Sequence, residues 1–166
     1  MFYRSKWIVA VTVALGLVVL IPAAQAEQPI DFTQYTSCTS TASSDDKEFT
    51  FASFECIGIT RSNQENKVFE NMSALVVGIV RTVAGNVTTI SYAKYMDRDG
   101  DFVIIESDES GPAAQFGGTW KILYGTGKWK GIKGSGKHVH VGAGKPIKPG
   151  TRLGYDRNTG TFELPK

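Results

Sequence analysis

The sequence predicts an all-β protein, a barrel or a sandwich, built from seven or eight antiparallel strands in one domain. Two observations lead to this fold class. Aromatic and β-branched residues alternate with polar ones in short runs, and turn residues separate these runs at intervals of roughly 8–14 residues. After the first 26 residues, no stretch of sequence shows an amphipathic helical period longer than about two turns.

The first 26 residues have the three parts of a secretory signal peptide. Arg4 and Lys6 precede an apolar run over residues 7–21, and the small-residue pattern Ala24-Gln25-Ala26 follows at once. The run is short for a transmembrane helix, which needs about 20 apolar residues, although a retained anchor is the alternative. We therefore expect cleavage after Ala26, no membrane span in the mature chain, and an exported protein, periplasmic or extracellular.

Residues 27–47 are rich in Ser, Thr and Asp without a clear period, which predicts an irregular leader before a single barrel domain over residues 48–166. The only cysteines, Cys38 and Cys56, lie in the exported portion and predict one disulfide that ties this leader to the first strand. A reactive thiol is disfavoured because the neighbour of Cys56 is the acid Glu55, which raises a thiol pKa.

The strands are expected in the following order. The first covers about 48–60, where aromatic residues crowd both faces. Residues 74–83 are apolar on both faces and 86–96 alternate after the turn at 84–86, which together predict a long hairpin. The Asp-rich turn 97–101 leads into a strand over 102–107, and three more strands follow in GTWKILYG, KHVHV and TGTFELP.

The stretch 117–140, GGTWKILYGTGKWKGIKGSGKHVH, combines many glycines with lysines and two tryptophans. Phosphate-binding loops need a helix after their glycines, and none is predicted here. The glycines instead suit tight turns and strand kinks, with Gly127, Gly131 and Gly134 the expected positions of positive φ. The lysines are expected to point outward from this hairpin.

The run GGTWKILYGTGKWKGIKGSG, with DRDGD and its strand before it, resembles the glycine-rich hairpin of small secreted proteins, bacterial ones among them, of the allene oxide cyclase and dirigent barrel superfamily. The resemblance covers roughly residues 92–138. It implies an antiparallel barrel of about eight strands with a calycin-like shape, commonly around an apolar cavity. No position matches the catalytic or substrate-contacting residues of those families, so no catalytic role is transferred and enzymatic activity stays uncertain.

Two clusters are weak candidates for metal ligands. Asp97, Asp99 and Asp101 offer the oxygens that Ca²⁺ prefers, but the EF-hand spacing is absent and a plain turn is the favoured interpretation. His138 and His140 share one face of a strand and would need a third ligand such as Glu106, Asp108 or Glu163 to hold Zn²⁺ or Cu²⁺. A pair of solvent-facing histidines is the favoured alternative, and a general base without an identified partner is the remaining one. We expect no cofactor.

Lysines interleaved with aromatic residues could form a nucleic-acid surface, but export excludes that partner and favours an anionic envelope component. A solvated basic rim is the simpler alternative. We expect an exported barrel that binds a small apolar or amphipathic ligand or an envelope partner. The expected pocket residues are Tyr92, Phe102, Trp120 and Tyr124. The alternatives are a cyclase or isomerase acting on a hydrophobic substrate, and a filled barrel with a structural or interaction role.

Overall fold

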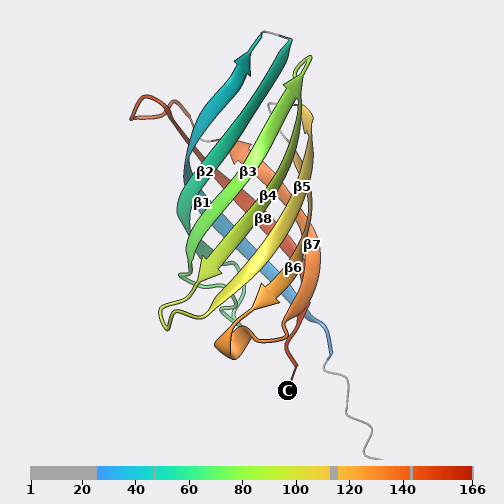
Figure 1. Ribbon diagram of the computed structural model, residues 1–166. Coiled ribbons are helices and arrows are strands. Elements are labelled where there is room, and N and C mark those ends of the chain that lie inside the picture. Colours follow the sequence, from blue (N-terminus) through green and yellow to red (C-terminus); the bar gives the residue numbers. More distant parts are fainter. Residues whose placement is uncertain (1–25, 47, 113–115, 143, 166) are drawn as a thin grey trace, which may run out of the picture.

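The computed structural model describes residues 26–46, 48–112, 116–142 and 144–165. Within them, eight antiparallel strands close into a barrel in which each strand pairs with its sequence neighbours and β8 pairs with β1 (Figure 1). The strands are β1 (Gln28–Asp45), β2 (Phe49–Ser62), β3 (Ser73–Val83), β4 (Asn86–Met96), β5 (Phe102–Pro112), β6 (Gly117–Gly125), β7 (Lys133–Gly142) and β8 (Thr151–Glu163). The predicted all-β antiparallel barrel is confirmed, whereas the predicted signal peptide lies outside the described residues apart from Ala26.

The irregular leader expected over 27–47 is wrong, because β1 occupies most of it and pairs with both β2 and β8. The sequence of β1 lacks the usual alternation of apolar and polar residues, because its inward positions include polar residues such as Gln34 and Thr36, both buried. The barrel therefore begins at Gln28. The predicted disulfide is confirmed, and it joins Cys38 and Cys56 as direct cross-strand partners on β1 and β2.

One end of the barrel, the lower end in Figure 1, is filled with aromatic side chains. The β2–β3 connection turns Phe69 into this end, where its ring centroid lies 5.1 Å from that of Phe32 and 5.7 Å from that of Tyr95. Trp129 of η1 (Gly127–Trp129) covers Phe69 from outside in an edge-to-face contact. We call this the plugged end, and its fully buried residues include Ile30, Phe32, Phe69, Met72, Val103 and Phe162.

The glycines of the β6–β7 hairpin serve two different purposes. Gly127 and Gly131 adopt positive φ in the turn, as predicted, whereas Gly134 does not. Gly136 on β7 and Gly160 on β8 instead make room for Trp120, since a Cβ on either would lie 2.6–2.8 Å from its ring. The Trp120 side chain thus fills the middle of the barrel, and its indole N–H donates to the Lys137 carbonyl at 3.1 Å.

The described part of the chain contains no helix with the length and apolar character required to cross a membrane.

Candidate functional site

A cavity of about 130 Å³ lies inside the barrel at the end opposite the plug. Its apolar wall includes Phe54, Val76 and Val80, and its polar groups come from β1, β4, β5, β7 and β8. The polar lining comprises Gln34, Thr36, Thr89, Ser91, Glu109, His140 and Asp156, and the exposed residues Thr39, Ser40 and Arg152 form the rim. Pockets for drug-sized ligands run to about 300–1,000 Å³, whereas a cavity near 150 Å³ holds benzene, so this one suits a single ring or a short chain.

Two larger hollows lie on the outer surface. One, of about 540 Å³, is bounded by Tyr35, Ile57 and Tyr155, and the other, of about 420 Å³, by Glu106, Lys121 and Lys137. Most of these side chains are exposed on the outward face of the sheet, so these volumes are mainly open solvent. The interior cavity is therefore the better candidate for a ligand site.

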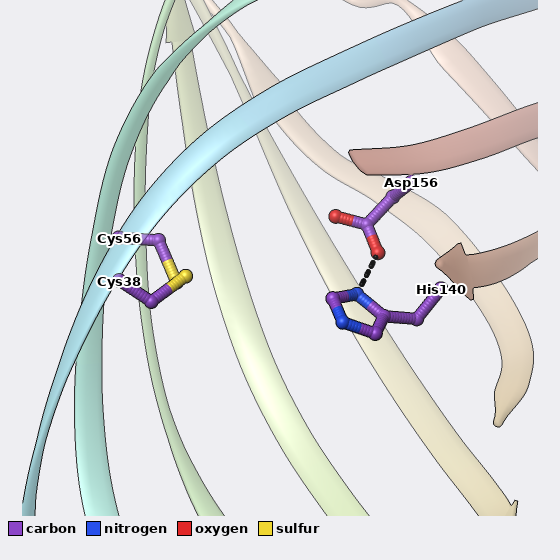
Figure 2. The surroundings of a disulfide bond; sticks show 4 residues. All are labelled: Cys38, Cys56, His140 and Asp156. Atoms are coloured by element: carbon purple, nitrogen blue, oxygen red, sulfur yellow. Dashed lines mark hydrogen bonds and ion pairs between the residues drawn. A yellow bond between two sulfur atoms is a disulfide. The ribbon is translucent and has the colours of Figure 1, made fainter. Parts of the chain in front are cut away.

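His140 and Asp156 form a pair inside this cavity (Figure 2). They are direct cross-strand partners on β7 and β8, and Nδ1 of His140 lies 2.7 Å from Oδ1 of Asp156. The ring of Phe116 stacks on the imidazole with a centroid distance of 4.7 Å. The hydrogen bond to Asp156 raises the pKa of His140 above its ordinary value of 6.5, although burial opposes this effect. Because an ionised carboxylate can only accept, Nδ1 carries the proton and Nε2 is the atom left for a ligand.

The other histidine, His138, also faces the interior and is 5 % exposed. Its Nε2 lies 3.3 Å from Oε1 of Glu109, at ion-pair distance but outside hydrogen-bond geometry, and it has no hydrogen bond within the described residues. Gly118 lies between the two on β6 and has no side chain to separate them. The solvent-facing alternative for the histidines is therefore wrong, since barrel closure turns the face that carries both of them inward.

The metal site suggested by the two histidines finds no support in the carboxylates considered as third ligands. Glu106 faces outward and pairs with Lys121 at 2.7 Å, and Asp108 is exposed on the same outer face. Glu163 lies at the far end of β8, paired with Lys133. Among the residues that the structure describes, no group of three or more His, Cys, Asp or Glu side chains has the geometry to hold a metal ion.

The Asp-rich turn is held by the protein's own donors. Oδ1 of Asp97 accepts from the backbone N–H groups of Asp99 and Asp101 at 2.9 and 3.1 Å. Oδ2 of Asp97 accepts from the indole of Trp129 at 3.0 Å and lies 2.8 Å from the ammonium of Lys128. Burial works to raise the pKa of Asp97, but the hydrogen bonds from Lys128 and Trp129 outweigh it and lower the pKa. These contacts account for the carboxylate of Asp97 without Ca²⁺.

None of the four aromatic residues expected in a pocket lines the cavity. Trp120 faces the interior but lies in the filled half of the barrel. Tyr92 and Tyr124 are 44 % and 57 % exposed, and Phe102 lies beside Tyr124 with the Lys94 ammonium 4.2 Å from its ring. The hydrophobic pattern misassigned the faces, because many inward positions around the cavity carry small polar side chains while several large apolar side chains face outward.

Sequence reasoning missed the boundary between the filled and the hollow halves. The hydroxyl of Tyr95 donates to Oε1 of Gln34, and Gln34 in turn lines the cavity. Burial, followed by the nearby charges of Asp156 and Glu109, raises the pKa of Tyr95 far above its ordinary value, so the phenol remains a neutral donor. The sequence of β1 contains no signal of such an interior, because Gln34 and Thr36 lie among polar residues without a clear period.

No family model and no curated protein matches the chain. Among solved structures, the chain is similar to that of a dirigent protein, the pterocarpan synthase GePTS1, with a TM-score of 0.51 and 9 % sequence identity. The match covers 93 % of this chain and 98 % of that chain. At this identity the likeness concerns the fold alone, and it agrees with the barrel that the glycine-rich hairpin indicated. The protein therefore has a dirigent-like, eight-stranded antiparallel β-barrel.

Proposed function

We propose that the protein binds a small amphipathic ligand in the cavity inside its barrel. The observation that carries this proposal is a cavity of about 130 Å³ in which an apolar wall faces the His140–Asp156 pair. Apolar lining with a few placed polar groups is the usual character of a small-molecule site. The structural neighbour is called a synthase, which supports by fold analogy alone that such a barrel can act on a small molecule.

The lining defines the ligand in two respects. The volume accommodates a single ring or a short chain, with any larger part of the ligand beyond the rim at Arg152. The polar end of the ligand needs a group that pairs with Nε2 of His140 or with the hydroxyls of Thr89 and Ser91. A purely apolar ligand binds more weakly, since it leaves these groups desolvated and unpaired.

Export is part of the same proposal. The Cys38–Cys56 disulfide is of the kind that persists in oxidising compartments, which agrees with the signal-peptide pattern in the sequence. An anionic envelope component on the basic hairpin is a weaker candidate partner. Lys121 and Lys128 are already paired with Glu106 on β5 and Asp97 in the β4–β5 turn, so acidic residues neutralise part of this basic face.

The test is a titration of the protein with cyclohexanol, benzoate and toluene, followed by NMR of the imidazole resonances and by thermal melting. We expect saturable binding of the two polar probes, a shift of the His140 resonance and a higher melting temperature, because a ligand that binds only the folded state stabilises it. Toluene should bind more weakly.

A matched pair of variants locates the site. Val76 lines the cavity, whereas its neighbour Val77 is 44 % exposed on the outer face. Val76→Phe should fill the cavity and abolish binding, and Val77→Phe should leave binding unchanged. Equal binding by both variants, or no saturable binding of any probe to the original protein, would refute the interior ligand site.

A further inference from the structure

We propose that the cavity is also a proton-transfer site, in which Nε2 of His140 acts as a general base toward a bound carbon acid and Asp156 positions the imidazole. This inference rests on the proposed ligand site and adds a chemical step to it. General bases must lie within hydrogen-bond reach of the bound substrate, and His140 is the histidine that lines the cavity.

The imidazole is held in one orientation from two sides. The 2.7 Å contact with Asp156 fixes the tautomer, and the stacked ring of Phe116, inclined by 23°, restricts rotation of the imidazole plane. A base oriented by a third group, here the carboxylate, is a recurrent catalytic arrangement. In Figure 2 the pair lies across the interior from the disulfide, so Nε2 faces the space between these walls.

The charged groups around His140 set its protonation. Asp156 on β8 and Glu109 on β5 favour the imidazolium, whereas Arg152 at the rim and burial oppose it. His138, two residues before it on β7, contacts Glu109 rather than His140. The balance of these effects raises the pKa of His140 above its ordinary value of 6.5, with the hydrogen bond to Asp156 as the largest cause.

The rest of the wall suits the charge that a deprotonated substrate develops. The hydroxyls of Thr36, Thr89 and Ser91 line the same cavity and can donate to a developing anion. The apolar side chains of Phe54 and Val76 exclude water from the carbon acid. The site thus combines a base, donors for the anion and an apolar surface around a space for one ring.

The experiment uses a nitrobenzisoxazole, whose ring opening reports base strength directly. Its isoxazole ring would occupy the cavity, and its nitro-bearing ring would extend to the rim at Arg152. Nε2 removes the ring proton, the C–H electron pair forms the nitrile, the N–O bond breaks, and a coloured phenolate leaves. The imidazolium then returns its proton to water, so that no oxidant or further reactant is needed. We expect a rate about 100-fold above that of His140→Gln, as for a positioned general base.

Matched variants separate chemistry from folding. His138→Gln makes the same change two residues away on the same strand, at a side chain outside the cavity lining, and should retain turnover. Asp156→Asn should move the midpoint of the pH–rate profile to lower pH, because it removes the carboxylate that raises the His140 pKa. Arg152→Gln should move it to higher pH, because Arg152 lowers that pKa.

Binding of a nitroindazole, the unreactive analogue of the probe, is measured in parallel by calorimetry. Binding of the analogue with no turnover of the reactive probe overturns the proton-transfer site and leaves the ligand site standing. The same holds if His140→Gln turns over at the rate of the original protein, or if Asp156→Asn leaves the pH midpoint unmoved. Absence of analogue binding overturns the proton-transfer site, whereas the ligand site is overturned only if cyclohexanol and benzoate also fail to bind.

Discussion

The plugged end and the cavity end of this barrel are built from the same strands, yet one is filled and the other is hollow. Strand β4 shows the difference within a single element. Its inward positions toward the cavity are Thr89 and Ser91, and those toward the plug are Ala93 and Tyr95. Small hydroxylated side chains leave space that aromatic side chains would fill, so the composition of the inward positions alone separates the two regions.

The border between the regions is the hydrogen bond from Tyr95 to Gln34. On one side of it, aromatic side chains contact one another edge to face. On the other, titratable groups such as His140 and Asp156 are held inside the barrel. The comparison implies that changes at the plugged end act mainly on stability, while changes at the cavity end act mainly on ligand binding and proton transfer.

The largest expected effect comes from truncation of an aromatic side chain at the plugged end. Phe32 is fully buried and contacts the rings of Phe69 and Tyr95 at 5.1 and 5.7 Å. We expect Phe32→Ala to lower the free energy of unfolding by about 3–5 kcal/mol, through lost burial and the cavity left behind. Urea denaturation measures this change.

The control is Phe54→Ala at the cavity end, where the side chain is half-buried and already borders empty space. Its truncation enlarges an existing cavity, so we expect a loss of less than about 2 kcal/mol. Equal losses for the two variants would show that the two ends do not differ in their contribution to stability.

The disulfide is expected to have the next largest effect, at the cavity end where aromatic packing is sparse. It closes a loop with a sequence separation of 18 residues. The loop-entropy argument gives about 3 kcal/mol for such a bridge, so the double variant Cys38→Ser, Cys56→Ser should melt roughly 10 °C lower. The variant should still fold, because the two positions remain paired in the ladder between β1 and β2. Two free thiols in the unfolded, unreduced protein would contradict the bridge.

Much of the fold was predictable because local alternation and turn chemistry indicate strands directly. The hairpin formed by 74–83 and 86–96 and the Asp-rich turn at 97–101 carry their signal in consecutive residues. Strand β1 carried no such signal. It is extended because it pairs with β2 on one side and β8 on the other, and its own sequence does not indicate a strand. Local pattern therefore succeeded for β4, where apolar and polar residues alternate visibly, and failed for β1, where polar residues occupy both faces.

The candidate site was less predictable, for a reason of topology. The shared face of His138 and His140 followed from their spacing, but whether it points inward depends on closure of the barrel. The partner of His140 is Asp156, which reaches it only through the register of β7 and β8. The prediction that Tyr92 lines a pocket was wrong for a related reason. Its small, polar neighbour Ser91 faces inward, so Tyr92 faces outward.

A glycine exchange tests how tightly the filled half is packed around Trp120. An added Cβ at Gly136 would lie 2.6 Å from the indole and closer still to the Thr159 carbonyl oxygen. Gly136→Ala should therefore destabilise the protein by about 1–3 kcal/mol, as overpacking does. At the cavity end of the same strand, a Cβ at Gly142 meets nothing within 4 Å, so Gly142→Ala should change stability by less than about 1 kcal/mol. Denaturant midpoints compare the two, and a tolerated Gly136→Ala would show a looser filled half.

The smallest expected effect is the pH dependence that the His140–Asp156 pair adds to stability. The pKa of His140 is raised in the folded state by its hydrogen bond to Asp156, so the stabilisation is fully present below the unfolded pKa of about 6.5 and is lost as pH rises through the folded value. The change should stay under about 1 kcal/mol, because the His140 side chain is 27 % exposed and solvent screens the pair.

Asp156→Asn should flatten the stability profile in this window. Carboxylates with lowered pKa values, such as Asp31 and Asp97, change the stability only at more acidic pH. They therefore do not contribute to the pH dependence in this range. A profile that stays the same in Asp156→Asn would mean that the pair does not form in solution, and the cavity end would then lose the base on which its proposed chemistry depends.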